Sequence, residues 1–331
     1  MNRYRWGFIG TGTIANEMAQ AITGHGGSVY AAAGRNYERT LKFTEKYGIP
    51  CAYRTTEELL ADPSVDIVYI ASHNQTHYAL AVSALERDKH VLIEKPITLN
   101  SRELNGLIGL ASTRKLIVAE AMTVWHMPLY RELATQIGKG KKLGRVQMIS
   151  ACFGSFKEYD MRNRYFSPAY AGGALLDIGG YALSAIRLFL TERPNEIYSQ
   201  WVPSPARTDE RETVILKNCA GEMAAATISL HSKQPKRVTV SCDNGYIEIW
   251  NYPRADRASV VYTDTGDKEE LVYGNTDDAL FYEFCDMENA VAAGDPSIMK
   301  VGSTRDVMDI MSQLRRSWGM CYPGETPTTL L

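Results

Sequence analysis

Residues 7–15 read Gly-Phe-Ile-Gly-Thr-Gly-Thr-Ile-Ala, and this stretch decides the fold of the N-terminal part of the chain. The apolar run at residues 4–9 is short enough for a buried strand, and residues 16–22 carry helical spacing. Between them lies the pattern Gly-x-Gly-x-x-Ala, which is typical of a dinucleotide-binding turn. The stretch therefore predicts a strand, a glycine-rich turn and the start of a helix.

The residues of this pattern have separate physical roles. Gly10 permits the tight turn, Gly12 lets a pyrophosphate approach the backbone, and Ala15 lets the helix pack closely on the strand. The N-terminus of the helix presents unpaired N–H groups and a positive dipole end to phosphates. An ordinary glycine turn is the alternative, but the position at the first βα turn of a long α/β pattern favours a dinucleotide site. The cofactor contacts expected here are Gly10, Thr11, Gly12, Thr13 and Ile14.

The composition is that of an ordinary globular protein with a large core: 331 residues, 45% hydrophobic and 22% charged. This length predicts two domains. The net charge of −2 supplies no basic field for nucleic acid or a membrane surface. The six cysteines are scattered, which argues against a zinc site or a disulfide framework and favours a cytoplasmic location. We also expect no signal peptide and no membrane span, because the first strand begins at once and no apolar run is long enough.

Strand-like and helix-like segments alternate regularly after the first turn. The strand-like runs are nearly continuous in apolar residues, as a parallel sheet buried on both faces requires. They lie at residues 28–33, 65–71, 90–94 and 116–121, and the helical segments lie at 37–47, 76–87 and 101–113. This alternation predicts a doubly wound parallel sheet, a Rossmann domain over residues 1–122.

Ligands of such sheets bind beyond the carboxyl ends of the strands, because all the parallel strands end at one edge. Three polar segments fall at that edge, at residues 72–77, 94–96 and 120–126. Further cofactor contacts are therefore expected from Ala71, Ser72, Asn74, His77, Glu94, Lys95 and Glu120.

The end of the second strand indicates which dinucleotide binds. A site that prefers NAD usually has an Asp or Glu here, bonded to the ribose 2′-hydroxyl. This chain has Gly34 followed by Arg35, with Arg39 one helical turn further on. A carboxylate would repel a 2′-phosphate, whereas guanidinium groups bind phosphate through charge-assisted hydrogen bonds. Both arginines would also suit a solvated surface, but the missing acid favours NADP over NAD.

The pattern changes near residues 122–125, and residues 123–331 predict a second domain of the α+β class. Its expected elements are a linking helix (127–140), a long strand (145–156), a polar loop (157–171), a helix (173–190), six or so short strands (196–273) and two closing helices. Turn signals between the short strands, such as Asp243-Asn244-Gly245, predict a large antiparallel or mixed sheet with one open face.

That open face is expected to mediate self-association. Alternating apolar residues on consecutive strands supply one sheet face: Val214, Leu216, Ala224, Ala226, Ile228 and Leu230. The helix after Gly173 and the closing helices would cover the other face. The closing helices have apolar stripes formed by Leu280, Phe284, Met287 and Val291, and by Val307, Ile310, Met311 and Leu314. A bare apolar face on a monomer would favour aggregation, so we expect a second copy to cover it.

Two polar sites stand out against the apolar pattern. Lys95 lies at the end of a buried strand, beside the expected crevice, where a solvated charge is unusual. Asp177 and Tyr181 are four residues apart and are therefore expected on one face of a helix. Each has an ordinary alternative: a lysine that reaches solvent from a sheet end, a helix cap and a core tyrosine. Their combination favours a catalytic site.

Three motifs in this order resemble the glucose–fructose oxidoreductase and inositol dehydrogenase (Gfo/Idh/MocA) family. They are the early Gly-x-Gly-x-x-Ala, Glu94-Lys95-Pro96 at a strand end, and residues 172–181, Gly-Gly-Ala-Leu-Leu-Asp-Ile-Gly-Gly-Tyr. The resemblance runs the length of the chain. The Asp-x-x-x-Tyr ending is most similar to the branch of dihydrodiol dehydrogenases and NADP-linked xylose dehydrogenases. Many relatives, including inositol dehydrogenases, have histidine where this chain has Tyr181, which argues against an inositol-type substrate.

The resemblance implies hydride transfer between a nicotinamide and a secondary alcohol or hemiacetal carbon of a sugar, polyol or cyclic diol. A base must then accept the proton of the hydroxyl group. The reference pKa of tyrosine is about 10, and a neighbouring ammonium group favours the phenolate. We therefore predict that Tyr181 is the acid/base, Lys95 its electrostatic partner or proton relay, and Asp177 the orienting group. The roles of Lys95 and Tyr181 could be exchanged.

The same resemblance implies several weaker features. Trp125, His126, Arg164 and Tyr165 are candidate substrate contacts, and surface or core roles are the alternative for His126, Arg164 and Tyr165. The Lys95–Pro96 peptide bond is expected to be cis, and the sheet of the second domain is expected to form dimers or tetramers. A dinucleotide-binding sensor without turnover is the alternative function. A methyltransferase is disfavoured, because Gly34 stands where such an enzyme normally has an acidic residue.

Overall fold

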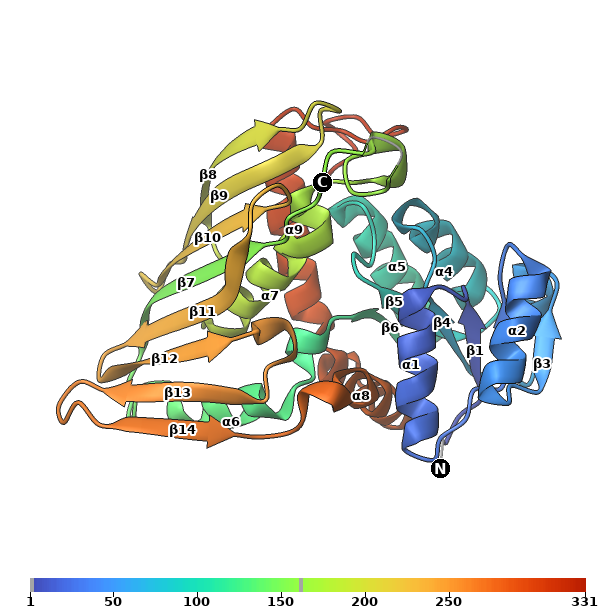
Figure 1. The fold of residues 1–331 in the computed structure, drawn as a ribbon, viewed down its shortest axis with the longest axis horizontal. Helices are drawn as coiled ribbons and strands as arrows, with labels where there is room; N and C mark the ends of the chain where they lie inside the picture. Colours follow the sequence, from blue (N-terminus) through green and yellow to red (C-terminus); the bar gives the residue numbers. More distant parts are fainter. Residues whose placement is uncertain (1–2, 161–162) are drawn as a thin grey trace. The chain divides into compact units, whose positions relative to one another are not determined.

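The computed structural model describes residues 3–160 and 163–331, which form two compact units (Figure 1). The first unit contains the chain up to Met122 and the segment Asp278–Gly302. The second contains Thr123–Asp277 and Ser303–Leu331. The chain passes between the units at Met122, as the change of pattern indicates, but the return of residues 278–302 to the first unit was not expected.

The first unit is built on a six-stranded sheet in the order β3-β2-β1-β4-β5-β6, with every pair parallel. Its strands are β1 (Trp6–Ile9), β2 (Ala31–Ala33), β3 (Cys51–Tyr53), β4 (Ile67–Ile70), β5 (His90–Glu94) and β6 (Val118–Ala121). Every residue of β1, β2, β4 and β6 is buried, as the continuous apolar runs predict, whereas the edge strand β3 is only partly buried. The predicted Rossmann sheet is confirmed, with β3 added at its edge.

The helices of this unit begin and end where local signals place them. They are α1 (Thr13–Gly24), α2 (Tyr37–Tyr47), α3 (Thr56–Ala61), α4 (His77–Leu85), α5 (Ser101–Arg114) and α8 (Ala279–Ala293), with short 3-10 turns η1 (Asn74–Thr76) and η7 (Pro296–Met299). The Asn100 side chain caps α5 by accepting from the Glu103 amide at 2.9 Å. Gly48 ends α2 in the left-handed conformation.

Helix α8 belongs to the first unit because of its apolar face. Leu280, Phe284 and Met287 are buried in one core cluster with Trp6 of β1 and Met18 of α1. The Trp6 and Phe284 rings lie 5.0 Å apart between centroids. The predicted apolar stripe is therefore correct, but its partner is the parallel sheet of the first unit. Assigning all of residues 123–331 to the second domain was wrong for this segment.

The second unit is built on an eight-stranded sheet in the order β14-β13-β12-β11-β7-β10-β9-β8. Its strands are β7 (Val146–Gly154), β8 (Glu196–Pro203), β9 (Asp209–Lys217), β10 (Met223–Ser229), β11 (Gln234–Cys242), β12 (Gly245–Trp250), β13 (Arg257–Tyr262) and β14 (Lys268–Val272). Strands β7 and β10 pair in parallel, and the other neighbours are antiparallel. The mixed sheet is confirmed, with seven strands after β7.

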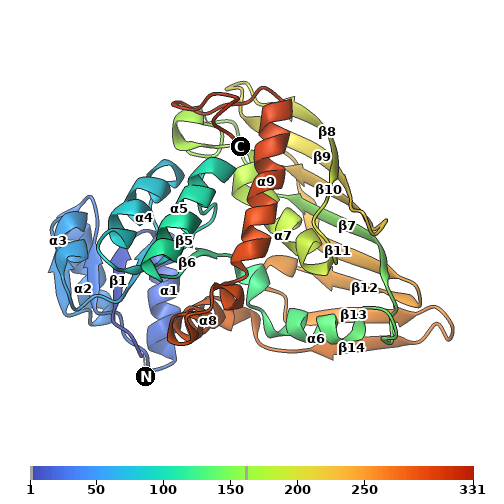
Figure 2. The ribbon, with the colours of Figure 1, turned by 180° about the vertical axis from the view of Figure 1, so that it is seen from behind.

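Helices cover one face of this sheet, as Figures 1 and 2 both show for α6, α7 and α9. Their bounds are α6 (Pro128–Gln136), α7 (Gly180–Phe189) and α9 (Val301–Ser317). The shorter elements are a π-helical turn, η4 (Leu175–Gly179), and the 3-10 turns η2 (Thr123–Trp125), η3 (Pro168–Tyr170), η5 (Tyr252–Arg254) and η6 (Thr276–Asp278). Among the described residues no helix is long and apolar enough to cross a membrane.

The faces of the sheet are the reverse of those expected. Val214, Leu216 and the apolar residues that alternate on β10 are almost fully buried on the face that α7 covers. The face without helices carries the intervening residues. Its large apolar side chains, all at least 40% exposed, are Met148, Tyr198, Val202, Ile215, Met223, Tyr246 and Trp250. Apolar alternation on β9 and β10 identifies a core face, because the more apolar set is the one the helices bury.

Candidate functional site

The glycine-rich turn joins β1 to α1 in the geometry that a dinucleotide requires. Gly10 has φ +110°, and a Cβ there would lie 2.2 Å from the Ala71 carbonyl oxygen at the end of β4. The Gly10 amide donates to the Ala33 carbonyl at 2.8 Å, which ties the turn to the end of β2. Only glycine fits at this position, because the turn passes directly against the neighbouring strand end.

The N-terminus of α1 is open to an anion. Gly12 is the N-cap residue, no side chain caps the helix, and its first turn has no acidic residue. A Cβ on Gly12 would meet no atom within 4 Å, so the space in front of the helix is clear. Thr13 and Ile14 form the first turn. These features fit the pyrophosphate of a dinucleotide, which would accept from the free N–H groups.

The ends of β2 and β4 bring a cation and a histidine together. Arg35 follows β2, and its Nη2 lies 2.7 Å from Nε2 of His73, which follows β4. A Cβ on Gly34 would lie 3.1 Å from Oγ1 of Thr40 and 3.6 Å from that of Thr11. Two hydroxyl groups and a guanidinium group therefore surround the position where an NAD site has its acid. His73 and Thr40 were not predicted, since either could serve a loop or a cap.

The Lys95–Pro96 turn follows β5, and its peptide bond is cis, as predicted. The fully buried His77 ring supports the turn: Nδ1 lies 2.8 Å from the Pro96 carbonyl oxygen, and Nε2 lies 3.3 Å from that of Ser72. Burial lowers the pKa of His77, so the ring stays neutral and one of its two nitrogens donates a hydrogen bond to a carbonyl oxygen. Asn74, another predicted cofactor contact, lies in η1, between Ser72 and His77 in the chain.

Two buried carboxylates, predicted as cofactor contacts, also lie against this turn. Glu120 of β6 accepts from the Ile97 amide at 3.1 Å. Glu94, the last residue of β5, accepts from the Tyr69 hydroxyl at 2.5 Å. Their exposed fractions are only 3% and 9%. These contacts give both residues a role in fixing the backbone on either side of Lys95.

In the second unit, two polar side chains interrupt a buried helical segment. From Ala171 to Ile186 every residue is buried except Asp177 and Tyr181, which are partly exposed. Asp177 lies in the π-helical turn, where the Gly180 amide bonds to the Leu175 carbonyl. The segment is therefore not the regular α-helix that was expected. Wide turns of this kind occur often at functional sites.

The predicted substrate contacts Arg164 and Tyr165 gather around Asp177. Nη1 of Arg164 lies 3.4 Å from Oδ1 of Asp177, and the Arg164 guanidinium lies 4.6 Å from the centre of the Tyr165 ring. The Tyr181 ring packs against Phe153 of β7, with centroids 6.1 Å apart. Asp177 therefore has a guanidinium beside it, and Tyr181 lies against the covered face of the sheet.

The other two predicted contacts are interior residues. Trp125 in η2 is 3% exposed, and His126 is fully buried. Each packs inside the second unit, since the neighbouring Thr123 hydroxyl donates to the Pro253 carbonyl at 2.5 Å. Trp125 and His126 thus support the fold where the chain enters this unit.

The start of the helical segment depends on a residue that sequence reasoning missed. Asp209, the first residue of β9, is fully buried, and its Oδ2 accepts from the Leu175 amide at 2.5 Å. A Cβ on Gly173, which has φ +128°, would lie 2.0 Å from Oδ1 of Asp209. Burial raises the pKa of Asp209 to about 6. No local pattern reveals this contact, because it joins residues 34 positions apart.

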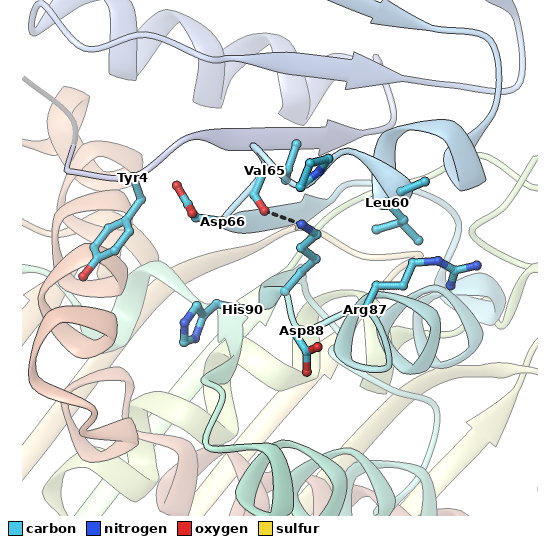
Figure 3. A pocket seen from close by; sticks show the side chains of 10 residues that line it. Tyr4, Leu60, Val65, Asp66, Arg87, Asp88 and His90 are labelled. Atoms are coloured by element: carbon cyan, nitrogen blue, oxygen red, sulfur yellow. Dashed lines mark hydrogen bonds between the residues drawn. The ribbon is translucent and has the colours of Figure 1, made fainter.

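A separate pocket of about 520 Å³ lies at the amino ends of β4 and β5 (Figure 3). Val65, Asp66 and His90 line it, and the Lys89 ammonium donates to the Val65 carbonyl at 2.7 Å. The glycine-rich turn, Arg35 and Lys95 lie at the opposite, carboxyl edge of the same sheet. This pocket is therefore distinct from the predicted cofactor site.

Both units contain residues that match the profile of a known protein family. Residues 4–122 match the profile described as "Oxidoreductase family, NAD-binding Rossmann fold", and residues 130–248 match that of the Gfo/Idh/MocA C-terminal domain. The trans-1,2-dihydrobenzene-1,2-diol dehydrogenase of Bos taurus is 31% identical over 249 residues, which is 74% of this chain and 73% of that protein. The Xenopus laevis enzyme of the same name is 26% identical over 332 residues, 96% of this chain and 99% of that protein.

Solved structures share the fold across nearly the whole chain. A levoglucosan dehydrogenase in complex with NADH and levoglucosan superposes with a TM-score of 0.82 at 18% identity, covering 95% of this chain and 96% of that one. A 3-ketoreductase from Actinomadura kijaniata, in complex with NADP and TDP-benzene, gives 0.79 at 22% identity, covering 95% and 97%. These likenesses show that the chain shares its fold with both proteins.

Proposed function

Since this chain belongs to the Gfo/Idh/MocA family of oxidoreductases, we propose that it is an NADP-dependent dehydrogenase of a sugar, polyol or cyclic diol. Membership of the family makes it an NAD(P)-dependent enzyme that acts on CH–OH groups. The choice of NADP rests on one observation, the Arg35 guanidinium beside His73 where an NAD site has a carboxylate. Relatives named for diol and sugar substrates support the substrate class.

The Arg35 contact gives the first expected result. Arg35→Ala should weaken NADP binding about tenfold to hundredfold, since a charge-assisted phosphate hydrogen bond contributes about 1.5–3 kcal/mol. Binding of NAD, which lacks the 2′-phosphate, should change little. Fluorescence titration of the reduced cofactors measures both effects. Leu41→Ala, an exposed neighbour on α2, is the matched control. Tighter binding of NAD than of NADP by the unchanged protein would refute the assignment.

The proposed chemistry divides between the two units. Bound NADP would supply the nicotinamide carbon that accepts or returns the hydride. Tyr181 takes the proton of the substrate hydroxyl as the hydride leaves, and returns it in the reverse reaction. Asp177, beside Arg164, is the orienting group and holds the substrate hydroxyl or Lys95 in place. Lys95 favours the phenolate of Tyr181 or relays its proton. A carbonyl product and the reduced cofactor balance the reaction.

Three features of the second unit support the role given to Tyr181. It is one of two partly exposed residues in an otherwise buried segment. Its ring is held against Phe153, so its position is fixed by packing. It follows a π-helical turn, whose start is fixed by the buried Asp209.

The direct test of the proposed function is to measure the absorbance of the reduced nicotinamide while aldoses, polyols and diols are screened with NADP. Binding of NADP without oxidation of any substrate would favour the sensor function.

We also propose that the face of the second unit's sheet without helices joins two or more copies. Ile215, Met223 and Met148 lie on adjacent strands of this face, since Met223 pairs with Met148 and Ile215 pairs with Ala225, two residues along β10 from Met223. Their exposed fractions are 44%, 40% and 53%. Neighbouring apolar side chains on three strands form a patch of the kind that a partner copy covers.

A charge inside that patch should separate the copies. Ile215→Lys should shift sedimentation at micromolar concentration from a dimer or tetramer to a monomer, because an unpaired ammonium group would have to be buried at the contact. Leu41→Lys places the same charge on an exposed leucine of the first unit, 43% exposed, and should leave the assembly intact. A monomeric unchanged protein would refute the proposal.

A further inference from the structure

Four cationic side chains gather at one end of the sheet in the second unit. Lys157 follows β7, Lys233 and Lys236 lie at the start of β11, and Arg254 ends η5. Backbone hydrogen bonds of 2.7 Å join these segments: the Lys157 amide donates to Leu230, and the Lys236 carbonyl accepts from Asn251. We call these four residues the cationic cluster.

The three lysines of the cationic cluster have no carboxylate to balance them. Within residues 3–160 and 163–331, none of them forms an ion pair. Burial, together with the positive charges of Lys233, Arg254 and Lys157, lowers the pKa of the partly buried Lys236. Holding three ammonium groups together without an ion-pair partner for any of them costs stability, so this arrangement of lysines is typical of a site that binds an anion.

Two chains of contacts connect the cationic cluster to the predicted catalytic residues. The Lys236 ammonium lies 4.9 Å from the centre of the Phe153 ring, against which Tyr181 also packs. The Lys157 ammonium lies 4.6 Å from the centre of the Tyr165 ring. The same ring lies 4.6 Å from the guanidinium of Arg164, which pairs with Asp177. Within one unit, the cluster is thus linked to Tyr181 through the Phe153 ring and to Asp177 through Tyr165 and Arg164.

We propose that the substrate carries an anionic group, a phosphoryl or a carboxylate, which the cationic cluster binds while the alcohol carbon lies at Tyr181 and Asp177. Lysine ammonium groups suit either anion as point charges, and the aromatic rings beneath two of them fix their positions. This inference rests on the proposed dehydrogenase function and narrows its substrate class from neutral sugars and diols to their acidic or phosphorylated forms.

Initial rates with NADP test the inference on three matched substrates: glucose, glucose 6-phosphate and glucuronate. The anionic compounds should be oxidised with kcat/KM at least tenfold above that of glucose, and the better of the two identifies the anion. In Lys236→Met this advantage should fall about tenfold or more through KM, since one charge-assisted contact is lost. The kcat of Lys236→Met should stay within a few-fold of that of the unchanged protein. A preference for glucose that Lys236→Met leaves unchanged would overturn the inference.

Companion variants keep the outcome clear. Lys233→Met, at an exposed position, should show the same loss if the partly buried Lys236 variant fails to fold. Lys268→Met on β14, with an ammonium group 61% exposed and paired with Glu270, is the matched control and should behave as the unchanged protein. The affinity for NADPH should be equal in all variants. Weaker NADPH binding in Lys236→Met would overturn the inference, because the cluster would then serve the cofactor.

A binding measurement separates this inference from the proposed function. Calorimetric titration of the NADP-saturated protein with inorganic pyrophosphate should show binding that Lys233→Met and Lys236→Met each weaken. If no substrate is turned over but this binding is found, the dehydrogenase proposal fails while the anion site stands. If neutral substrates are turned over and pyrophosphate binding is absent or insensitive to both variants, the anion site fails while the dehydrogenase proposal stands.

Discussion

Tyr181→Phe should lower turnover by about 10²–10⁴-fold, the range that a general acid/base group typically contributes. The change removes one hydroxyl group and keeps the ring that packs against Phe153, so the fold should survive. Because the loss lies in the chemical step, kcat should fall while the affinity for NADPH stays the same. Tyr273→Phe, at a position 41% exposed, removes the same atom outside the site and is the control.

Lys95→Met completes this test. It preserves side-chain length and removes the charge, so the phenol should lose the cation that the proposed mechanism assigns to it. The alkaline limb of the pH–rate profile should then move to higher pH, and turnover should fall at least as far as in Tyr181→Phe. Near-normal turnover of Tyr181→Phe on a true substrate would place the proton acceptor elsewhere, with Lys95 as the first residue to examine.

The second large effect concerns stability and comes from Asp209. Its native pKa of about 6 lies above the ordinary value of 3.8 for an aspartate, because burial disfavours the carboxylate. The folded protein therefore binds a proton more tightly than the unfolded chain, and this contribution to stability is lost as the pH rises from about 4 to about 6. A difference of about two pKa units corresponds to about 3 kcal/mol.

Asp209→Asn should abolish this contribution to the pH dependence. The amide oxygen can still accept from the Leu175 amide, but nothing titrates at the site. Relative to the unchanged protein, the variant should gain about 3 kcal/mol in free energy of unfolding between pH 4 and pH 7. Urea unfolding at several pH values measures the difference, with Asp264→Asn in an exposed turn as the control. A constant difference across this range would contradict the expectation.

The features that the sequence predicts well are those that depend on neighbours in the chain. The glycine-rich turn follows from residues a few positions apart, whereas the cis Lys95–Pro96 bond was expected from the family resemblance. Strand β3 was missed because its three residues at the sheet edge are too few for a period to emerge. Apolar alternation on β9 and β10 marks the face that the helices cover, and the expectation was wrong in leaving that face bare.

Features formed by distant residues could not be predicted in this way. The Arg35–His73 contact joins two strand ends 38 positions apart, and the Asp209 contact joins a strand to the start of a helix. The cationic cluster combines three segments that only the sheet order brings together. From the sequence alone, each of these residues is equally well explained by an ordinary surface or loop role. Only the contact in the structure distinguishes that role from a functional one.

The return of α8 to the first unit has a consequence for biosynthesis. The core of that unit includes Leu280, Phe284 and Met299 together with Trp6 and Met18. During translation, residues 123–277 of the second unit emerge before Leu280, Phe284 and Met299 do. The nucleotide-binding sheet therefore leaves the ribosome with part of its core uncovered, and its folding cannot finish in simple N-to-C order. Completion waits for a segment that is made nearly at the end of synthesis.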